Sequence, residues 1–235
     1  MMAAFVREGP FDGAGAVSQL LPGEPFAVLD ITSGWAWGYC TADHRVGYVE
    51  AIELADPVEA SHVVVEAAAP IQSCADPLSA PLTHLPMGSR LQGEVRGAML
   101  QIEAGCVPLS YLRPVGEPEA DAVAVAQRLL GTPYLAGGRT RHGIDCSGLV
   151  QLSLQLCGVD APRDSCEQRR LGQPLSEEMP LKRGDLLFCG DHAGMMVDDR
   201  MAIQVSLESG KVAVEPFICA SPAGDAGEIE RRRVG

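Results

Sequence analysis

The sequence predicts an α+β protein, with small β-barrels in the first half and a helix followed by antiparallel strands in the second. Three observations predict this fold class. Residues 1–115 show short apolar runs broken by Pro-Gly, Ser-Gly and Arg-Gly turn signals, as small β-barrels do. Residues 146–157 carry apolar side chains at spacings of three and four, the pattern of a helix that buries one side. Residues 184–205 hold short apolar segments interrupted by turn residues, which is typical of strands.

The first half carries signs of an internal duplication. The segments Val17–Leu29 and Pro81–Gly93 share a Leu-Pro-x-Gly core at positions 21–24 and 85–88, apart from one shifted residue. Such a repeat predicts two barrels of about sixty residues each. We therefore expect the first barrel over residues 1–56 and the second over residues 57–115.

A helix marks the boundary to the second half. Pro118 suits a first turn, acidic residues lie near the positive end, and Gly131 suits the end of a helix that runs through Leu130. We expect the remaining domain to cover residues 116–235. In the first barrel, Trp35 and Trp37 alternate on one face of a strand; we expect at least one of them in the core, and either could stack on a substrate or on the other domain.

Cys146 is the candidate nucleophile. Asp145 suits the N-cap of the helix that follows, so Cys146 falls in the first turn, where free N–H groups and the positive dipole end favour a thiolate. A thiolate is the form that attacks carbonyls. The alternative is that Cys146 is a small buried apolar residue, as many free cysteines are.

His192 is the candidate base and Gln204 the residue that orients it. If residues 198–200 form a three-residue hairpin loop, His192 and Gln204 become diagonal neighbours on one face of the sheet. A nucleophile, a base and an orienting polar group in this order suit acyl transfer. His142 is a rival base closer in sequence, but a loop residue is poorly held for proton transfer.

The second half resembles the NlpC-type cell-wall peptidases, a papain-like family of cysteine enzymes that cut peptide bonds in bacterial peptidoglycan stems. The resemblance rests on motifs in a fixed order: Gly131-Thr-Pro-Tyr-Leu135, Gly137-Gly-Arg139, Gly143-Ile-Asp-Cys-Ser-Gly148, Pro162-Arg-Asp-Ser165 with Gln168, Arg183-Gly-Asp-Leu186 and Asp191-His-Ala-Gly194. It implies a papain-like catalytic domain in which the helix carrying the cysteine packs on an antiparallel sheet.

The sequence departs from the family pattern twice. Ala136 stands where a tryptophan is usual, and Gln204 stands where the third catalytic residue is most often histidine. Glutamine can hold an imidazole ring by hydrogen bonding but carries no charge. The departures put the shape of the pocket and the turnover rate in question.

The resemblance also implies which residues contact the substrate. The Tyr134 hydroxyl would lie beside the nucleophile, and Asp164 with Ser165 would bind the free amino end or the D-glutamate of a stem peptide. The motif around the cysteine adds Asp145 and Ser147 as substrate contacts. As an alternative, Asp164 and Ser165 could cap a short helix. Two arginines are expected to be solvated or paired with nearby acids and are left out of the site: Arg139 and Arg141.

The two expected barrels resemble bacterial Src-homology-3-type (SH3-like) domains. In extracellular relatives such domains often bind the cell wall. In soluble relatives that take part in cell-wall recycling they help to enclose the active site.

The first residues show no long apolar run behind a basic start, so we expect no signal peptide. The eight cysteines are scattered without CxxC clusters. We therefore expect neither a disulfide framework nor a zinc site, and a reducing cytoplasm as the location. No cofactor or metal is required.

A net charge of −13 and a pI near 4.7 disfavour nucleic acid and acidic wall polymers as partners, and no stretch reaches membrane-spanning length. A small soluble substrate fits better. The basic run at residues 228–233 is expected to be a solvated tail.

The expected function is hydrolysis of the γ-D-glutamyl–diamino acid bond in freed peptidoglycan peptides during cell-wall recycling. A free N-terminal L-alanine on the substrate, met by Asp164, is implied by the resemblance alone. The alternative is an inactive or weakly active muropeptide-binding protein on the same fold, with Ala136 and Gln204 as signs of decay. A third option is acyl transfer to an acceptor other than water.

Overall fold

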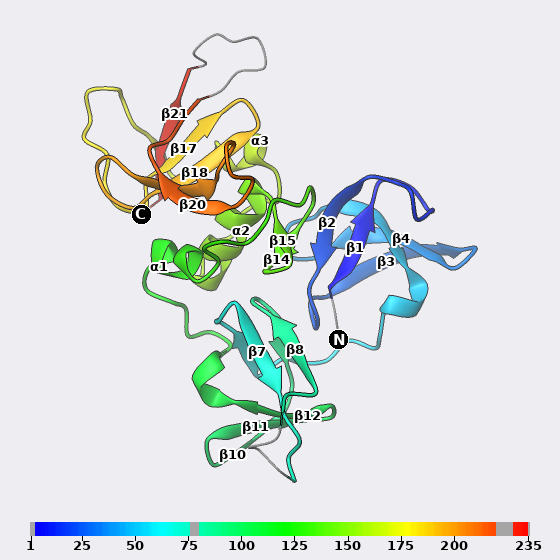
Figure 1. The fold of residues 1–235 in the computed structure, drawn as a ribbon. Coiled ribbons are helices and arrows are strands. Elements are labelled where there is room, and N and C mark those ends of the chain that lie inside the picture. Colours follow the sequence, from blue (N-terminus) through cyan, green and yellow to red (C-terminus); the bar gives the residue numbers. More distant parts are fainter. Residues whose placement is uncertain (1–2, 76–79, 220–227, 235) are drawn as a thin grey trace. The chain divides into compact units, whose positions relative to one another are not determined.

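The computed structural model describes residues 3–75, 80–219 and 228–234 and divides the chain into two compact units, Met1–Pro118 and Glu119–Gly235 (Figure 1). Each unit is described by itself. Within the described residues, no helix is long and apolar enough to cross a membrane.

The first barrel is one antiparallel sheet of five strands in the order β2-β1-β5-β4-β3. Val6, Leu20, Cys40 and Val49 form its core. The elements are β1 (Ala4–Arg7), β2 (Ala16–Leu20), β3 (Phe26–Thr32), β4 (Trp35–Cys40), β5 (Val46–Glu50) and the 3-10 turn η1 (Ala51–Glu53).

The two tryptophans of β4 lie on the outer face of this sheet. Ala36 and Cys40 point into the core, so Trp35 and Trp37 project to the opposite side, where Trp37 is 39% exposed. The expectation that one of them packs in the core is therefore wrong. The alternation of side chains along a strand leaves both rings outside it.

The segment expected to form the second barrel consists of shorter strands in three small sheets, in the orders β10-β11-β12, β13-β6-β9 and β7-β8. Its core includes Val64, Ile71, Leu85 and Leu100. The elements are β6 (His62–Val64), β7 (Ala68–Ile71), β8 (Thr83–Pro86), β9 (Arg90–Leu91), β10 (Glu94–Arg96), β11 (Met99–Ile102), β12 (Gly105–Pro108), η2 (Leu109–Tyr111) and β13 (Leu112–Pro114).

Two local features of this first unit bear on the sequence predictions. Gly23 and Gly88, which follow the two Leu-Pro cores, have φ of 77° and 84°, a backbone conformation that favours glycine. Cys74 and Cys106 form a disulfide with their Cα atoms 5.2 Å apart. The expectation of no disulfides is thus wrong, because the backbone bridge between Gln72 and Cys106 brings two distant cysteines together.

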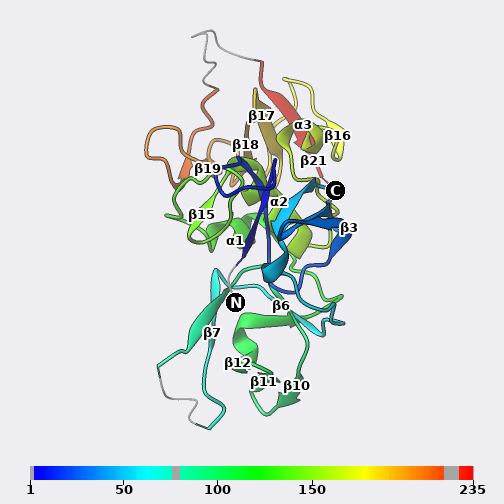
Figure 2. The same cartoon turned by 90° about the vertical axis from the view of Figure 1, so that its right-hand side faces the viewer.

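The second unit packs helices on one six-stranded sheet with the order β16-β21-β17-β18-β19-β20, as two views show (Figure 1, Figure 2). The long helix α2 contacts β18, β19 and α1. The elements are α1 (Ala122–Gln127), β14 (Arg139–Thr140), β15 (Gly143–Ile144), α2 (Cys146–Leu156), α3 (Ser165–Gln168), β16 (Gln173–Pro174), β17 (Leu186–Cys189), β18 (His192–Met196), β19 (Ala202–Val205), β20 (Val212–Glu215) and β21 (Glu230–Arg233).

The boundary helix is shorter than the sequence predicts. The Asp121 carboxylate accepts hydrogen bonds from the N–H groups of Val123 and Ala124, so α1 begins at Ala122 and not near Pro118. After Gln127 the chain continues in turns to Gly131, whose φ is 81°.

The basic run near the C-terminus is not a solvated tail. It forms β21, which pairs with β16 and β17 inside the sheet. Arg233 holds the buried carboxylate of Asp185 through two hydrogen bonds of 2.7 and 2.6 Å. A sequence separation of 48 residues hides this pairing from local patterns.

Candidate active site

Asp145 caps helix α2, as predicted, and organises the loop in front of it. One carboxylate oxygen accepts from the Gly148 N–H at 2.7 Å and the other accepts from the Gly137 N–H at 2.9 Å. The cap fixes Cys146 as the first residue of α2. The helix ends after Leu156, and Gly158 follows with φ of 77°.

A buried arginine that the sequence analysis missed completes this cap. Arg163 makes a two-pronged ion pair with Asp145, at 2.9 and 2.6 Å, and donates a third hydrogen bond of 2.8 Å to the Ser147 hydroxyl. The Ser147 hydroxyl also donates to Asp145 at 3.2 Å. Because these groups bond one another, the side chains of Asp145 and Ser147 hold the helix start, and their contact with substrate stays a prediction.

The Cys146 thiol lies against the start of β18. It donates a hydrogen bond of 3.3 Å to the Asp191 carbonyl, and the Ala193 N–H bonds to the sulfur from the other side of His192. Burial, and secondly the charge of Asp145, raise the pKa of this thiol above its ordinary value. The N–H groups of Cys146 and Ser147 at the helix start lower this pKa, as expected, but burial and Asp145 outweigh them, so the net shift favours the thiol.

His192 and Gln204 meet as the hairpin register predicts. Gly194 pairs with Gln204, and the Val197 N–H donates to the Met201 carbonyl, so the loop holds residues 198–200. His192 then lies diagonally across from Gln204, and its Nε2 is 3.0 Å from the Gln204 Oε1. Gln204 is 1% exposed, so the pair is held in a buried setting.

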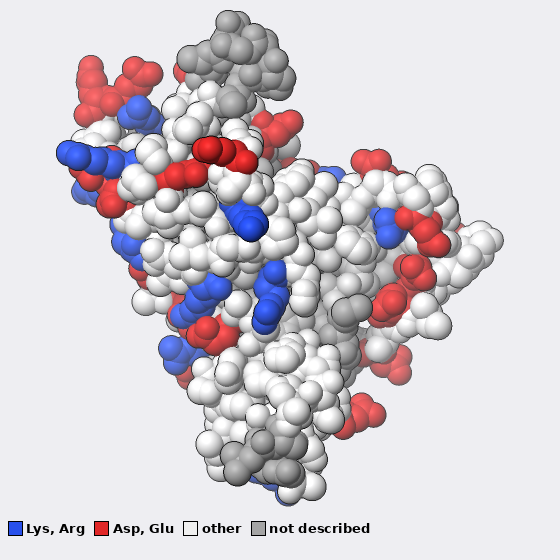
Figure 3. Space-filling model, viewed as in Figure 1, with Lys and Arg blue, Asp and Glu red and all other residues white. Residues whose placement is uncertain are grey.

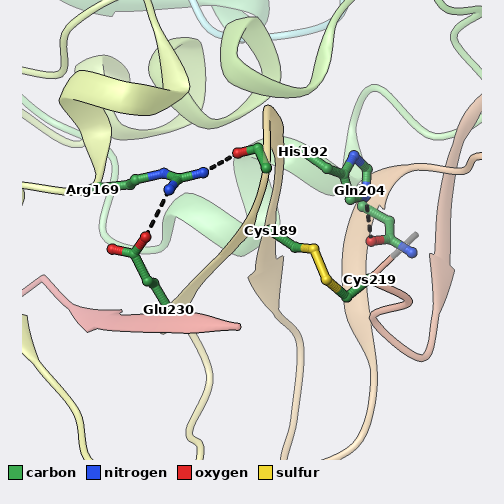
Figure 4. Close-up of a disulfide and its surroundings, with 7 residues drawn as sticks. Arg169, Cys189, His192, Gln204, Cys219 and Glu230 are labelled. Atoms are coloured by element: carbon green, nitrogen blue, oxygen red, sulfur yellow. Dashed lines mark hydrogen bonds and ion pairs between the residues drawn. A yellow bond between two sulfur atoms is a disulfide. The ribbon is translucent and has the colours of Figure 1, made fainter. Parts of the chain in front are cut away.

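An aromatic ring and a disulfide hold His192 from a third segment. Phe217 stacks on the imidazole with ring centres 5.3 Å apart. A Cβ on Gly194 would lie 3.1 Å from the Phe217 ring, so this position needs glycine for close packing. Cys219, two residues after Phe217, forms a disulfide with Cys189 beside the His192–Gln204 pair (Figure 4).

The turn that precedes His192 is also anchored. Arg169, just after α3, makes an ion pair of 2.6 Å with Glu230 of β21 and donates a hydrogen bond to the Gly190 carbonyl (Figure 4). These contacts join α3, the β17–β18 turn and the C-terminal strand around the catalytic hairpin. The C-terminal residues thus help to position a site that lies far from them in sequence.

The other predicted substrate residues fall around the same helix start. Tyr134 forms a parallel bridge with Ile144, two residues before the cysteine, and its side chain is 56% exposed. Burial, with the charges of Asp145 and Cys146, raises the Tyr134 pKa, which indicates how near the phenol is to the thiol. Asp164 directly follows Arg163, and its side chain makes no capping bond to α3.

Three residues near the nucleophile differ in their placement. His142 is exposed in the turn between β14 and β15, as expected of a poorly held loop residue. Arg141 is exposed, but Arg139 is 1% exposed and donates to the Gln155 side chain of α2 at 3.1 Å. Of the two expectations for Arg139, solvation is therefore wrong, and pairing with a nearby acid stays a prediction.

On the face drawn in Figure 3, basic and acidic side chains are interspersed.

Comparison with known proteins agrees with this geometry. The family model described as "NlpC/P60 family" matches residues 131–220, and one described as "Bacterial dipeptidyl-peptidase Sh3 domain" matches residues 6–54. A "Probable endopeptidase" of Haemophilus influenzae is 30% identical over 115 residues, which cover 44% of this chain and 71% of that protein. The chain belongs to the NlpC/P60 family.

Two further relatives each match a little over a third of this chain. A "Probable endopeptidase NlpC homolog" of Haemophilus influenzae is 34% identical over 90 residues, covering 37% of this chain and 49% of the relative. The "Murein DD-endopeptidase MepS/Murein LD-carboxypeptidase" of Escherichia coli K12 is 34% identical over 88 residues, covering 35% of this chain and 46% of the relative. The chain spans about half the length of each.

A solved structure extends the likeness to most of the chain. The crystal structure of an NlpC/P60 family protein from Bacillus cereus matches with a TM-score of 0.77 over 93% of this chain and 82% of that chain, at 20% identity. At this identity the match shows the fold. The predicted α+β class, a papain-like domain preceded by an SH3-like domain, is confirmed.

Proposed function

We propose that this NlpC/P60 protein is a cysteine peptidase that hydrolyses the γ-D-glutamyl–diamino acid bond of peptidoglycan stem peptides. The observation that carries the proposal is the site itself. Cys146 begins α2, its thiol bonds the backbone on both sides of His192, and Gln204 holds the imidazole at 3.0 Å. Cys146 thus lies against the backbone groups that flank His192, and Gln204 bonds the imidazole, an arrangement that suits acyl transfer.

The proposed reaction has two halves. His192 takes the Cys146 proton as the sulfur attacks the γ-carbonyl, and an S–C bond forms. The backbone N–H groups of Cys146 and Ser147, which face the sulfur, stabilise the oxyanion. His192 then gives the proton to the amino group of the departing diamino acid as the C–N bond breaks. Water, deprotonated by His192, hydrolyses the thioester and frees Cys146.

Substrate contacts are proposed for the residues around the helix start. Asp164 is acidic and precedes α3 directly, so its carboxylate suits a free amino end, with Ser165 beside it. The Tyr134 phenol suits a donor to the substrate carbonyl region. A free N-terminal L-alanine on the substrate is part of this proposal.

The choice of bond draws support from the first unit. The model that matches residues 6–54 is named for dipeptidyl-peptidases, enzymes that release dipeptides. Cleavage after γ-D-glutamate in a stem peptide with a free L-alanine releases the dipeptide L-Ala-γ-D-Glu. The Escherichia coli relative is named a DD-endopeptidase and LD-carboxypeptidase, so those bonds are the competing candidates.

A panel of peptides tests the choice. The protein is incubated with L-Ala-γ-D-Glu-meso-diaminopimelate, with the same tripeptide acetylated at its N-terminus, and with cross-linked and tetrapeptide stems that carry DD and LD bonds. Release of L-Ala-γ-D-Glu from the free tripeptide alone supports the proposal. Cleavage of the DD or LD bonds alone would contradict the proposed bond specificity. Equal cleavage of the acetylated peptide would contradict the proposed contact between Asp164 and a free amino end. Tight binding without any cleavage indicates the inactive muropeptide binder.

A further inference from the structure

The orientation of the Gln204 side chain is fixed by groups behind it. Its Nε2 lies 2.9 Å from a carboxylate oxygen of Glu215 and 3.4 Å from the Pro216 carbonyl oxygen. Both partners accept hydrogen bonds and neither donates, so the amide NH₂ must face them. The amide oxygen is then the end that faces His192.

This orientation decides the protonation of the ring. An amide oxygen only accepts, so the His192 Nε2, at 3.0 Å, must carry a proton and donate. In a neutral imidazole with a proton on Nε2, Nδ1 is the nitrogen that can accept one. A reversed amide would put its NH₂ against Nε2 and favour the opposite tautomer, which cannot act as a base through Nδ1.

We propose that Glu215 is a positioning residue that, through the Gln204 amide, holds His192 as the Nε2–H tautomer and leaves Nδ1 to take the Cys146 proton. This deepens the proposed function, because it rests on Cys146 and His192 as nucleophile and base. Glu215 touches neither substrate nor thiol. Its position at the end of β20, half-buried and paired to β19, places its carboxylate behind Gln204.

The arrangement explains how an uncharged third residue serves this site. Gln204 itself carries no charge, but the Glu215 carboxylate polarises the Gln204 amide and through it stabilises an imidazolium. Among the described residues, the titratable groups on the elements packed around His192 include Cys146 at the start of α2, Glu215 at the end of β20 and Asp191 in the preceding turn. Cys189 of β17 is in a disulfide and does not titrate.

The test compares the full chain with three variants. Glu215→Gln removes the charged and nearer of the two acceptors, because a glutamine can present either its oxygen or its NH₂ to Gln204, and leaves only the Pro216 carbonyl at 3.4 Å. Glu208→Gln removes the same charge from an exposed position in the turn between β19 and β20 and is the matched control. The double variant Gln204→Glu/Glu215→Gln restores an obligatory acceptor at position 204, which the amide introduced at position 215 can support.

Two readouts avoid any peptide substrate. Nitrogen-15 NMR of labelled histidine, assigned by the signals lost in His192→Ala, reports the tautomer. The rate of iodoacetamide labelling at pH 7, read by mass spectrometry on the Cys146 peptide, reports the proton transfer. We expect the Nε2–H form in the native protein and a mixture of tautomers in Glu215→Gln. Labelling of Cys146 in that variant should be about tenfold slower, which is less than the whole contribution of a general base to a rate because part of the ring population keeps the active tautomer. The double variant should regain protonated Nε2 and most of the rate.

A native tautomer and native labelling rate in Glu215→Gln would overturn the inference, as would a double variant no better than the single one or a loss of equal size in Glu208→Gln. If Glu215→Gln alone does not fold, the native protein decides, since protonated Nε2 in it supports the inference and protonated Nδ1 in a neutral ring overturns it. Failure to cleave the tripeptide would contradict the proposed function. The NMR and labelling measurements would still test the role of Glu215, because neither uses a peptide substrate.

Discussion

Arg163 and Asp145 form a two-pronged ion pair, at 2.9 and 2.6 Å, beneath the first turn of the helix that carries the cysteine. The Arg163 side chain is 2% exposed and the Asp145 side chain 15%. Since Asp145 also bonds the N–H groups of Gly137 and Gly148, the pair ties three segments to one carboxylate. Its charge lies next to the thiol and must be balanced for Cys146 to lose a proton.

Removing the arginine alone should be costly. Arg163→Met keeps most of the side-chain volume but leaves the Asp145 carboxylate buried without its cation, so we expect a loss of about 3–5 kcal/mol in the free energy of unfolding. Urea denaturation measures it. The double variant Arg163→Met/Asp145→Asn should recover part of the loss, because no buried charge remains. A single variant within about 1 kcal/mol of the native protein, the range of an exposed pair, would contradict this role.

The reactivity of Cys146 should depend on pH in a stated direction. Burial and Asp145 raise its pKa, so the thiolate fraction at pH 7 is small, and alkylation should increase with pH through and beyond the ordinary thiol value of about 8.5. Mass spectrometry of the Cys146 peptide across a pH series gives the midpoint, with the urea-unfolded protein as reference. A midpoint below that of the unfolded protein would instead indicate a thiolate–imidazolium pair at rest.

Gly194 should be intolerant of a side chain. A Cβ there would lie 3.1 Å from the Phe217 ring and 3.2 Å from the Gln204 Cβ, so Gly194→Ala must displace one of the two groups that hold His192. We expect a fall in kcat of roughly tenfold, within the range that misplacement of a general base causes. Gly13→Ala, where the nearest atoms are 3.7 Å away, is the control and should leave kcat unchanged. Equal activity in both variants would contradict the conclusion that close packing at Gly194 holds His192 in place.

The disulfides predict a count of free thiols. Eight cysteines are present, and Cys74–Cys106 and Cys189–Cys219 are paired, so four thiols should titrate in the denatured, unreduced protein: Cys40, Cys146, Cys157 and Cys166. Disulfides persist in oxidising compartments, whereas the expected cytoplasmic location predicts reduced thiols, so the count also tests that location. Eight titrating thiols in protein taken directly from cells under alkylating conditions would favour the cytoplasm.

The parts of the site predicted from sequence are those fixed by local geometry. The Asp145 cap, the start of α2 and the His192–Gln204 register follow from helix capping and from a three-residue loop, and the structure confirms each. The fold class followed from periodicity and turn signals. These features depend on neighbours within about a dozen residues, where patterns are informative.

The missed features all depend on partners distant in sequence. Arg163 lies 18 residues from Asp145, the Cys189–Cys219 pair spans 30 residues, and β21 finds β17 across the sheet. The sequence does not distinguish a buried arginine from an exposed one, and the spacing of cysteines does not reveal which of them form disulfides. The helix start lowers the pKa of the Cys146 thiol as predicted, but the burial of the thiol, which depends on the folded structure, and the charge of Asp145 raise it by more.

The most direct test of the account is hydrolysis of L-Ala-γ-D-Glu-meso-diaminopimelate by three proteins, the native chain, Cys146→Ala and Cys166→Ala, followed by mass spectrometry. Cys166 is an exposed free cysteine on α3 and serves as the matched control. We expect the native protein and Cys166→Ala to release L-Ala-γ-D-Glu at the same rate, and Cys146→Ala to lose at least about a thousandfold, as removal of a nucleophile does. Release by Cys146→Ala at a rate near that of the native protein would contradict the assignment of Cys146 as the nucleophile.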